Sequence, residues 1–159
     1  LPIIFACENN LYATQSPMSQ RQPLDNIYQR GEPIGIPGTR VDGNNVVEIY
    51  EVTRDAVNRC RAGQGPSLIE ARTYRWLEHC GPNDDDHLGY RKDKEVKKWK
   101  TNCPIEKTKD YLLNNKLADE KEIQTVSQEL DDEIEEAFEF AKTSPFLDKK
   151  HLYTSIYSD

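Results

Sequence analysis

The chain has 159 residues, enough for one domain with its own core or for a large part of a bigger protein. Its 28 acidic residues outnumber its 21 basic ones, and the net charge of −7 argues against nucleic acid or an anionic membrane as the main partner. No apolar segment approaches the roughly 18 residues that span a bilayer, and no signal-peptide pattern is recognisable. We therefore expect neither a nucleic-acid nor a membrane partner.

The cysteines are scattered and form no Cys-x-x-Cys pair, as their positions show: Cys7, Cys60, Cys80 and Cys103. This spacing favours reduced thiols over a disulfide framework, so we expect a cytoplasmic protein of bacterial type. The sequence begins without Met, inside an apolar segment. We expect it to be a piece of a longer polypeptide.

A short apolar run over residues 3–7 has the composition of a buried parallel strand, and Glu8, Asn9 and Asn10 follow it. Asparagines at a strand end are typical of a turn, because Asn tolerates left-handed backbone angles and bonds its own main chain. A second interpretation is that the amide oxygens face a ligand or a metal ion. The residues by themselves leave both open.

Residues 11–36 are polar and interrupted by Pro and Gly, which predicts a long surface loop with about one helical turn. Next come a strand of two or three residues within GTRVDGNN, a helix over 46–61 that ends before Gly63, and a second strong strand that starts at Pro66. Strand, loop, strand, helix, strand is the order of an α/β fold with a parallel sheet.

Everything beyond Tyr90 has a helical pattern. The last long helix, over residues 119–142, carries one apolar stripe made of Ile123, Val126, Leu130, Ile134, Ala137 and Ala141. Its many carboxylates form either a solvated face, which we favour, or a cation site.

The segment TYRWLEHCGP places Arg75 and His79 four residues apart where a strand gives way to a loop. Ligands of parallel α/β sheets bind at such strand ends, and a guanidinium offers paired donors to phosphate. The alternative is an Arg and a His in ordinary surface hydrogen bonds. A zinc site at His79, Cys80 and His87 is disfavoured by the adjacent His and Cys, and a nucleophilic Cys80 by the same adjacency. The serine-hydrolase, Walker and Rossmann signatures are missing from the sequence.

Several segments together carry a resemblance to a known family: LPIIFACENNLYA, IPGTRVDGNNV, GPSLIEARTYRWLEHCGP, GYR and RKDKEVKKWKTNCPIEKTKDYLL. They resemble the alpha subunit of the thiamine-diphosphate-dependent first component of the pyruvate, branched-chain and acetoin dehydrogenase complexes. The resemblance covers essentially the whole chain. It implies that residues 1–92 are the C-terminal half of the α/β domain that binds thiamine diphosphate, and that residues 93–159 are a helical C-terminal region of the same domain.

The same resemblance assigns roles to four residues. The Asn10 side chain and the Tyr12 main-chain carbonyl would bind the Mg²⁺ that bridges the diphosphate, a cation that prefers oxygen ligands. Arg75 would contact the diphosphate. His79 would match the family's loop histidine, which contacts the cofactor and handles the bound intermediate. The family's Gly-Asp-Gly, which opens the cofactor motif, would belong to an upstream N-terminal half.

The resemblance also implies an oxidoreductase. In the family the cofactor decarboxylates a pyruvate-like 2-oxo acid, or cleaves acetoin, and the acyl group passes to a lipoyl-bearing acyltransferase component. A beta subunit completes the site, so an α2β2 heterotetramer is expected.

Two positions depart from the common family pattern. Glu78 stands where many members have Gly before the loop histidine, and Cys80 stands where many eukaryotic members have a phosphorylatable Ser. Glu78, together with the Gly-Asp-Gly half that this sequence lacks, motivates an alternative, a non-catalytic interaction domain of the same fold that lacks the cofactor. A sugar-acting enzyme of transketolase type fits the segment YRWLEHCGP less well.

Overall fold

The computed structural model describes residues 1–154. The chain divides into two compact units, Leu1–Tyr111 and Leu112–Asp159. The predicted division at residue 92, with both parts in one domain, stays a prediction. The last five residues of the predicted helical region lie outside the described residues.

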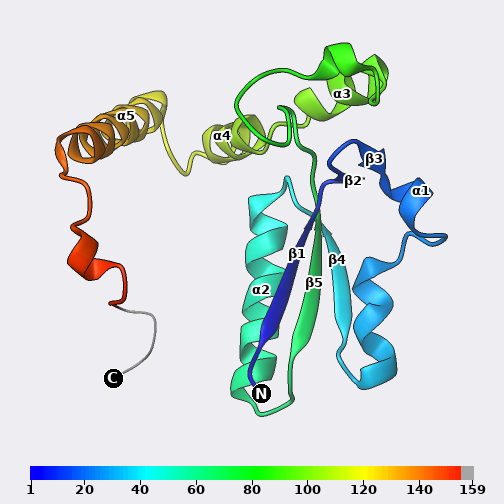
Figure 1. Ribbon diagram of the computed structural model, residues 1–159. Helices are drawn as coiled ribbons and strands as arrows, with labels where there is room; N and C mark the ends of the chain where they lie inside the picture. Colours follow the sequence, from blue (N-terminus) through cyan, green and yellow to red (C-terminus); the bar gives the residue numbers. More distant parts are fainter. Residues whose placement is uncertain (155–159) are drawn as a thin grey trace. The chain divides into compact units, whose positions relative to one another are not determined.

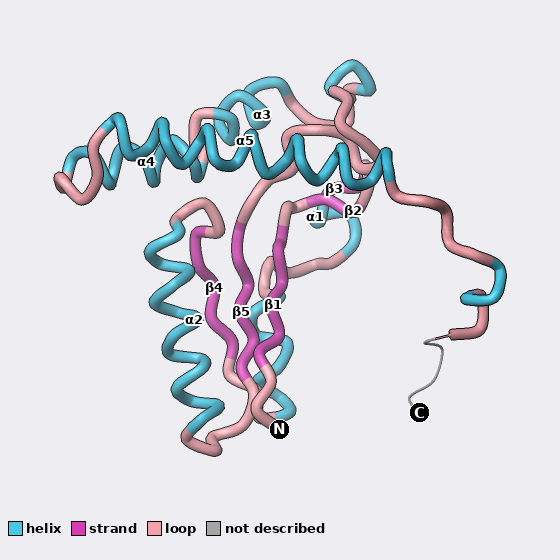
Figure 2. The backbone as a smooth tube through the Cα atoms, turned by 90° about the vertical axis from the view of Figure 1, so that its left-hand side faces the viewer, coloured by secondary structure: helices cyan, strands magenta, loops and turns pink. Residues whose placement is uncertain are grey.

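The first unit is built on a parallel sheet of three strands in the order β1-β5-β4 (Figures 1 and 2). The strands are β1, Ile4–Asn9, β5, Ser67–Arg72, and β4, Gly38–Asp42. The predicted α/β class with a parallel sheet is therefore confirmed. The strand predicted within GTRVDGNN is longer than expected, because all five residues of β4 pair with β5.

One face of this sheet is apolar and is covered by α2, Val46–Arg61. Val41 and Ile69 from two neighbouring strands pack with Ala56 of the helix, and these three residues form the buried core. The predicted helix over 46–61 is confirmed. The Asn45 side chain accepts a hydrogen bond from the Glu48 main chain, which satisfies one of the free N–H groups at the helix start.

The opposite face of the sheet is polar and is covered by η1, Ile27–Ile34. Tyr28 donates its main-chain N–H to Glu70 of β5 at 2.9 Å. A Cβ at Gly38 would collide with the main chain of Tyr28, so this close approach needs glycine. This packing was not predicted, because residues 11–36 are polar and they pack on a sheet face that is also polar.

The segment 11–36 lies at the surface as predicted, with Gly31 alone buried among these residues, but it is more ordered than the predicted loop. Besides η1, this segment contains the short hairpin strands β2, Tyr12–Ala13, and β3, Ser16–Pro17, followed by α1, Met18–Arg21. It is an ordered connection that returns from the end of β1 to the polar face.

The segment after β5 leads through η2, Asp86–Leu88, to α3, Asp93–Lys100. Val96 of α3 is buried, and the Trp99 ring stacks on Tyr74 with 5.4 Å between the ring centroids. These contacts attach α3 to the end of the sheet. A further helix, α4, runs over Pro104–Asn114.

The second unit contains α5, Glu120–Thr143, and η3, Lys149–His151. Asp119 and Glu122 form a capping box at the start of α5, and the predicted long helix is confirmed. Its apolar stripe is exposed in this structure, as in Val126 and Ile134. Among the described residues, no helix has both the length and the apolar character that a membrane crossing requires.

Candidate functional site

The carboxyl ends of the three parallel strands lie together. Arg72, the last residue of β5, pairs with Asn9 at the end of β1 on one side and with Asp42 at the end of β4 on the other. The segments that follow these three residues therefore leave the same edge of the sheet (Figure 1). Ligand sites of open α/β sheets lie outside this edge.

The turn after β1 is held by its two asparagines. Asn9 Oδ1 accepts a hydrogen bond from the main-chain N–H of Leu11, and Asn10 Oδ1 accepts one from the N–H of Tyr12, both at 3.0 Å. Leu11 has a φ of +72°, a left-handed conformation that is uncommon for a residue other than Gly. The turn interpretation of the asparagine pair is thus correct. It leaves the ligand interpretation open, because an amide oxygen can accept a second interaction.

The side chain of Tyr12 is held by other residues. Its main-chain oxygen is therefore the group that could bind a metal ion. Its hydroxyl donates to Glu95 of α3, with the two carboxylate oxygens at 3.0 and 3.1 Å, and its ring meets Tyr74 and Tyr90 edge-on. Burial, and then the hydrogen bond to Glu95, raises the pKa of Tyr12 to about 12. In the hairpin the Met18 N–H donates to the Leu11 carbonyl at 2.8 Å, so the next pair, Tyr12 and Pro17, is a non-hydrogen-bonded pair and the Tyr12 carbonyl points away from β3.

Arg75 has two buried, unsatisfied donors at this edge, more than any other cation among the described residues. Its Nη2 donates to the Thr14 carbonyl at 2.9 Å and to the Tyr90 hydroxyl at 2.8 Å. Its Nε and Nη1 are buried and have no hydrogen-bond partner among the residues that the structure describes. Buried N–H groups without partners are rare in proteins, and here they belong to the side chain that was predicted to bind an anion.

The loop between β5 and α3 is anchored by Arg91, which was not among the predicted site residues. Arg91 is buried, forms ion pairs with Asp85 and with Asp86, the latter at 2.7 Å, and donates to the Arg75 carbonyl at 2.6 Å. Tyr90 donates to Asp85 at 2.7 Å. Asp85 is buried although it stands in a run of three acidic residues. The adjacent Tyr90 and Arg91 in the GYR segment were the available signal.

His79 lies in the exposed part of the same loop. Within residues 1–154, no hydrogen bond or ion pair joins it to Asn10, Tyr12 or Arg75, so its predicted catalytic role stays a prediction. Glu78 is bonded inside the loop, where its carboxylate accepts from the Asn83 side chain at 3.0 Å.

The oxygen ligands and N–H donors at this edge of the sheet suit Mg²⁺ with a diphosphate better than they suit zinc. In the part of the chain that the structure describes, no three His, Cys, Asp or Glu side chains are grouped to hold a metal ion, so the zinc alternative at His79 and the cation alternative on α5 gain no support. Asn10 and Tyr12 offer an amide and a main-chain oxygen, the kind of ligand that Mg²⁺ takes. Arg75 offers free N–H donors for a phosphate oxygen.

The chain is similar to known proteins over its whole length. A profile of the dehydrogenase E1 component family matches residues 1–150. The chain is 36% identical to the chloroplastic pyruvate dehydrogenase E1 component subunit alpha-3 of Oryza sativa subsp. japonica, with 100% of this chain and 37% of that protein covered. It is 34% identical to the 2-oxoisovalerate dehydrogenase subunit alpha of Bacillus subtilis, with 99% of this chain and 47% of that protein covered.

A third relative, the pyruvate dehydrogenase E1 component subunit alpha of Rhizobium meliloti, is 36% identical and is covered over 44% of its length. The chain thus spans less than half the length of these curated relatives. The predicted resemblance is confirmed, and with it the type of subunit, because all three relatives are alpha subunits. The chain belongs to the dehydrogenase E1 component family.

Proposed function

We propose that this chain supplies the strand ends that bind Mg²⁺ and diphosphate in the alpha subunit of a thiamine-diphosphate-dependent 2-oxo acid dehydrogenase. The observation that carries the proposal is the pair of buried, unpartnered donors on Arg75, at the sheet edge from which the Asn10 turn also leaves. In this proposal Asn10 and the Tyr12 carbonyl hold the metal, and Arg75 binds the diphosphate. The predicted Gly-Asp-Gly comes from an upstream half of the same subunit.

Thiamine diphosphate supplies the electron sink that allows a 2-oxo acid to lose carbon dioxide. The residues of this chain anchor and orient it. The positive guanidinium of Arg75 is held by Thr14 and Tyr90, so its remaining N–H groups are already aimed before an anion arrives. Such preorganisation lowers the entropy that binding costs. We assign His79, on the exposed loop, to contact with the cofactor and to proton transfer during the acyl step.

The substrate and the partners follow from the relatives and remain part of the proposal. Relatives named for pyruvate and for 2-oxoisovalerate match the chain with similar identity, 36% and 34%, so the substrate class is a 2-oxo acid, with acetoin as the alternative. The partners are a beta subunit, in an α2β2 assembly, and a lipoyl-bearing acyltransferase component. A cytoplasmic location is likewise proposed.

Calorimetric titration tests this function directly. Thiamine diphosphate is titrated, with and without Mg²⁺, into the full-length alpha subunit that contains this chain, purified with its beta subunit. We expect binding that requires Mg²⁺, and decarboxylation of pyruvate, 2-oxoisovalerate or both. Absence of binding to this complete assembly would overturn the proposal and favour the non-catalytic interaction domain.

The metal ligand is tested by a matched pair of variants. Asn10→Ala removes the proposed ligand oxygen, so the Mg²⁺ concentration needed for half-maximal activity should rise and activity at limiting Mg²⁺ should fall by orders of magnitude. Asn58→Ala, on the exposed surface of α2, is the control. Equal Mg²⁺ requirements for the two variants would remove Asn10 from the metal site.

A further inference from the structure

Glu70 is a charged residue at the centre of the sheet. It lies in the middle strand β5, and its side chain is fully buried. Burying a carboxylate is costly unless its oxygens are paired and hydrogen-bonded. The groups that bind the Glu70 carboxylate therefore explain why it can be buried next to the strand ends.

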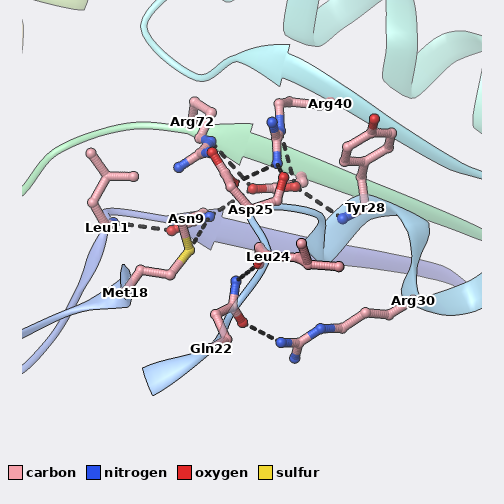
Figure 3. A network of polar contacts seen from close by, with 11 residues as sticks. Asn9, Leu11, Met18, Gln22, Leu24, Asp25, Tyr28, Arg30, Arg40 and Arg72 are labelled. Carbon is pink, nitrogen blue, oxygen red and sulfur yellow. Dashed lines mark hydrogen bonds and ion pairs between the residues drawn. The ribbon is translucent and has the colours of Figure 1, made fainter. Parts of the chain in front are cut away.

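Four groups surround the Glu70 carboxylate. It accepts hydrogen bonds from the Asn9 side chain at 2.6 Å, from the Tyr28 main chain at 2.9 Å and from Arg40 at 3.2 Å, and Arg72 lies within 3.3 Å. Figure 3 shows Asn9, Arg40 and Arg72 directed into this network. The shortest of these contacts is the one to Asn9.

The contact to Asn9 decides which way its amide points. A carboxylate only accepts hydrogen bonds, so it selects the NH₂ end of the Asn9 side chain. The oxygen end is then turned toward the Leu11 N–H, which it accepts at 3.0 Å. That bond closes the left-handed turn at Leu11, and the same turn carries Asn10 and Tyr12.

We infer that Glu70 is a positioning residue for the metal-binding turn, acting through the Asn9 amide. The inference rests on the proposed function. Glu70 itself touches neither cofactor nor metal. Its role is to keep Asn9 in the one orientation that holds the main chain of residues 10–12 in a fixed place.

A purely structural role for Glu70 makes a different prediction. The carboxylate is paired with Arg40 and Arg72, and both arginines also pair with Asp25, so the network could serve only to join η1 to the sheet. In that case any change in the network would act on folding stability. It would not act selectively on the turn that follows β1.

The test is an exchange of donor and acceptor between two residues. Glu70→Gln keeps the shape but leaves one acceptor oxygen. The Tyr28 main chain and Arg40 both donate to Oε2, so we expect the remaining oxygen to stay with them. The new NH₂ group then faces the NH₂ of Asn9, and the Asn9 amide must rotate and lose Leu11. The double variant Asn9→Asp with Glu70→Gln restores the pairing, because Asp accepts from both the Gln side chain and the Leu11 N–H. It also keeps the net charge of the wild type.

Mg²⁺ affinity is measured calorimetrically at saturating thiamine diphosphate, on the full-length alpha subunit purified with its beta subunit. Loss of an outer partner typically weakens metal binding about 10- to 100-fold, and we expect a loss in this range for Glu70→Gln. The double variant should return to within about threefold of the wild type, which is well inside that range. Asp25→Asn, which changes the exposed side of the network, is the control and should bind as the wild type does.

Hydrogen exchange without metal gives a second readout. The amides of Leu11 and Tyr12 should exchange faster in Glu70→Gln and recover in the double variant. Wild-type Mg²⁺ affinity and exchange in Glu70→Gln would overturn the inference, as would a folded double variant that is not restored. Failure of the wild type to bind Mg²⁺ would overturn the proposed function instead, and the exchange data would still report whether Glu70 holds the turn.

Discussion

At the scale of single residues, the proposed site depends on groups that have been placed before any ligand arrives. Arg75 is oriented by Thr14 and Tyr90, and Tyr12 is oriented by Glu95. The residues that hold these groups are as important to the site as the groups themselves.

Substitution of Arg75 should weaken binding of the cofactor in a graded way. Arg75→Gln removes the charge and should raise the dissociation constant of thiamine diphosphate about 10- to 100-fold, since a hydrogen bond to a charged group contributes ~1.5–3 kcal/mol. Arg75→Lys keeps the charge but loses the planar fork, so its loss should be intermediate. Calorimetry measures both, with the exposed Arg54→Gln of α2 as control. Wild-type affinity in Arg75→Gln would contradict the assignment.

His79 and His87 form a natural pair for testing the loop histidine, because both are exposed in the segment after β5. His79→Ala should lower turnover in the assembled enzyme by about 10²-fold or more, the usual share of a proton-transfer group. The α2β2 assembly should remain intact. His87→Ala should retain activity. Equal activities for the two variants in a steady-state assay would mean that His79 is not catalytic.

At the scale of elements, the apolar and helical parts of the fold could be predicted from the sequence and the polar sheet face could not. The helix over 46–61 was predictable because its apolar stripe and its ends are local signals. η1 was missed because it packs on the sheet through polar contacts such as Tyr28 with Glu70, residues 42 positions apart. The spacing of apolar residues within one segment does not reveal polar contacts with residues so far away in the sequence.

The site divides in the same way. The asparagine turn was predictable because each asparagine bonds a main-chain group two positions further on. The burial of Asp85 could not be predicted, because both of its neighbours in the sequence are acidic and only the fold brings the buried Arg91 against it. The partner of Asn9 was equally invisible, since Glu70 belongs to a different strand.

The loop between β5 and α3 offers a comparison of two adjacent acidic residues. Asp85→Asn leaves the buried Arg91 short of an anionic partner and should lower the free energy of unfolding by roughly 3 kcal/mol, at the low end for a broken buried pair because Asp86 still pairs. Asp84→Asn changes an exposed side chain and should have little effect. Chemical denaturation measures both. Equal stabilities would show that the Arg91 ion pair does not anchor the loop.

At the scale of the whole molecule, stability should decline in strong alkali. Burial raises the pKa values of Tyr12, Tyr74 and Tyr90, Tyr12 reaching about 12 from an ordinary value of 10.0. A raised tyrosine pKa means that folding favours the neutral form. Its contribution is complete below the unfolded pKa and is lost as the pH rises through the folded pKa. The loss should therefore begin near pH 10, and the part due to Tyr12 should be complete a little above pH 12.

Tyr12→Phe isolates one part of this alkaline loss. The variant cannot ionise at position 12, so its free energy of unfolding should fall less steeply over the same pH range, while Tyr74 and Tyr90 still contribute. Denaturation curves recorded at several pH values measure the slope. An unchanged slope would indicate that Tyr12 is not protected from ionisation in the folded protein.

The bond between Asn9 and Glu70 joins positions 61 apart in the chain, and it makes the turn impossible to transplant by itself. A synthetic peptide that copies β1 and its hairpin would carry both asparagines and lack the acceptor that orients the first. A designer who grafts this turn onto another parallel sheet must also provide a glutamate on the neighbouring strand, opposite the position that Cys7 occupies here. The unit that must be copied is a pair of strands.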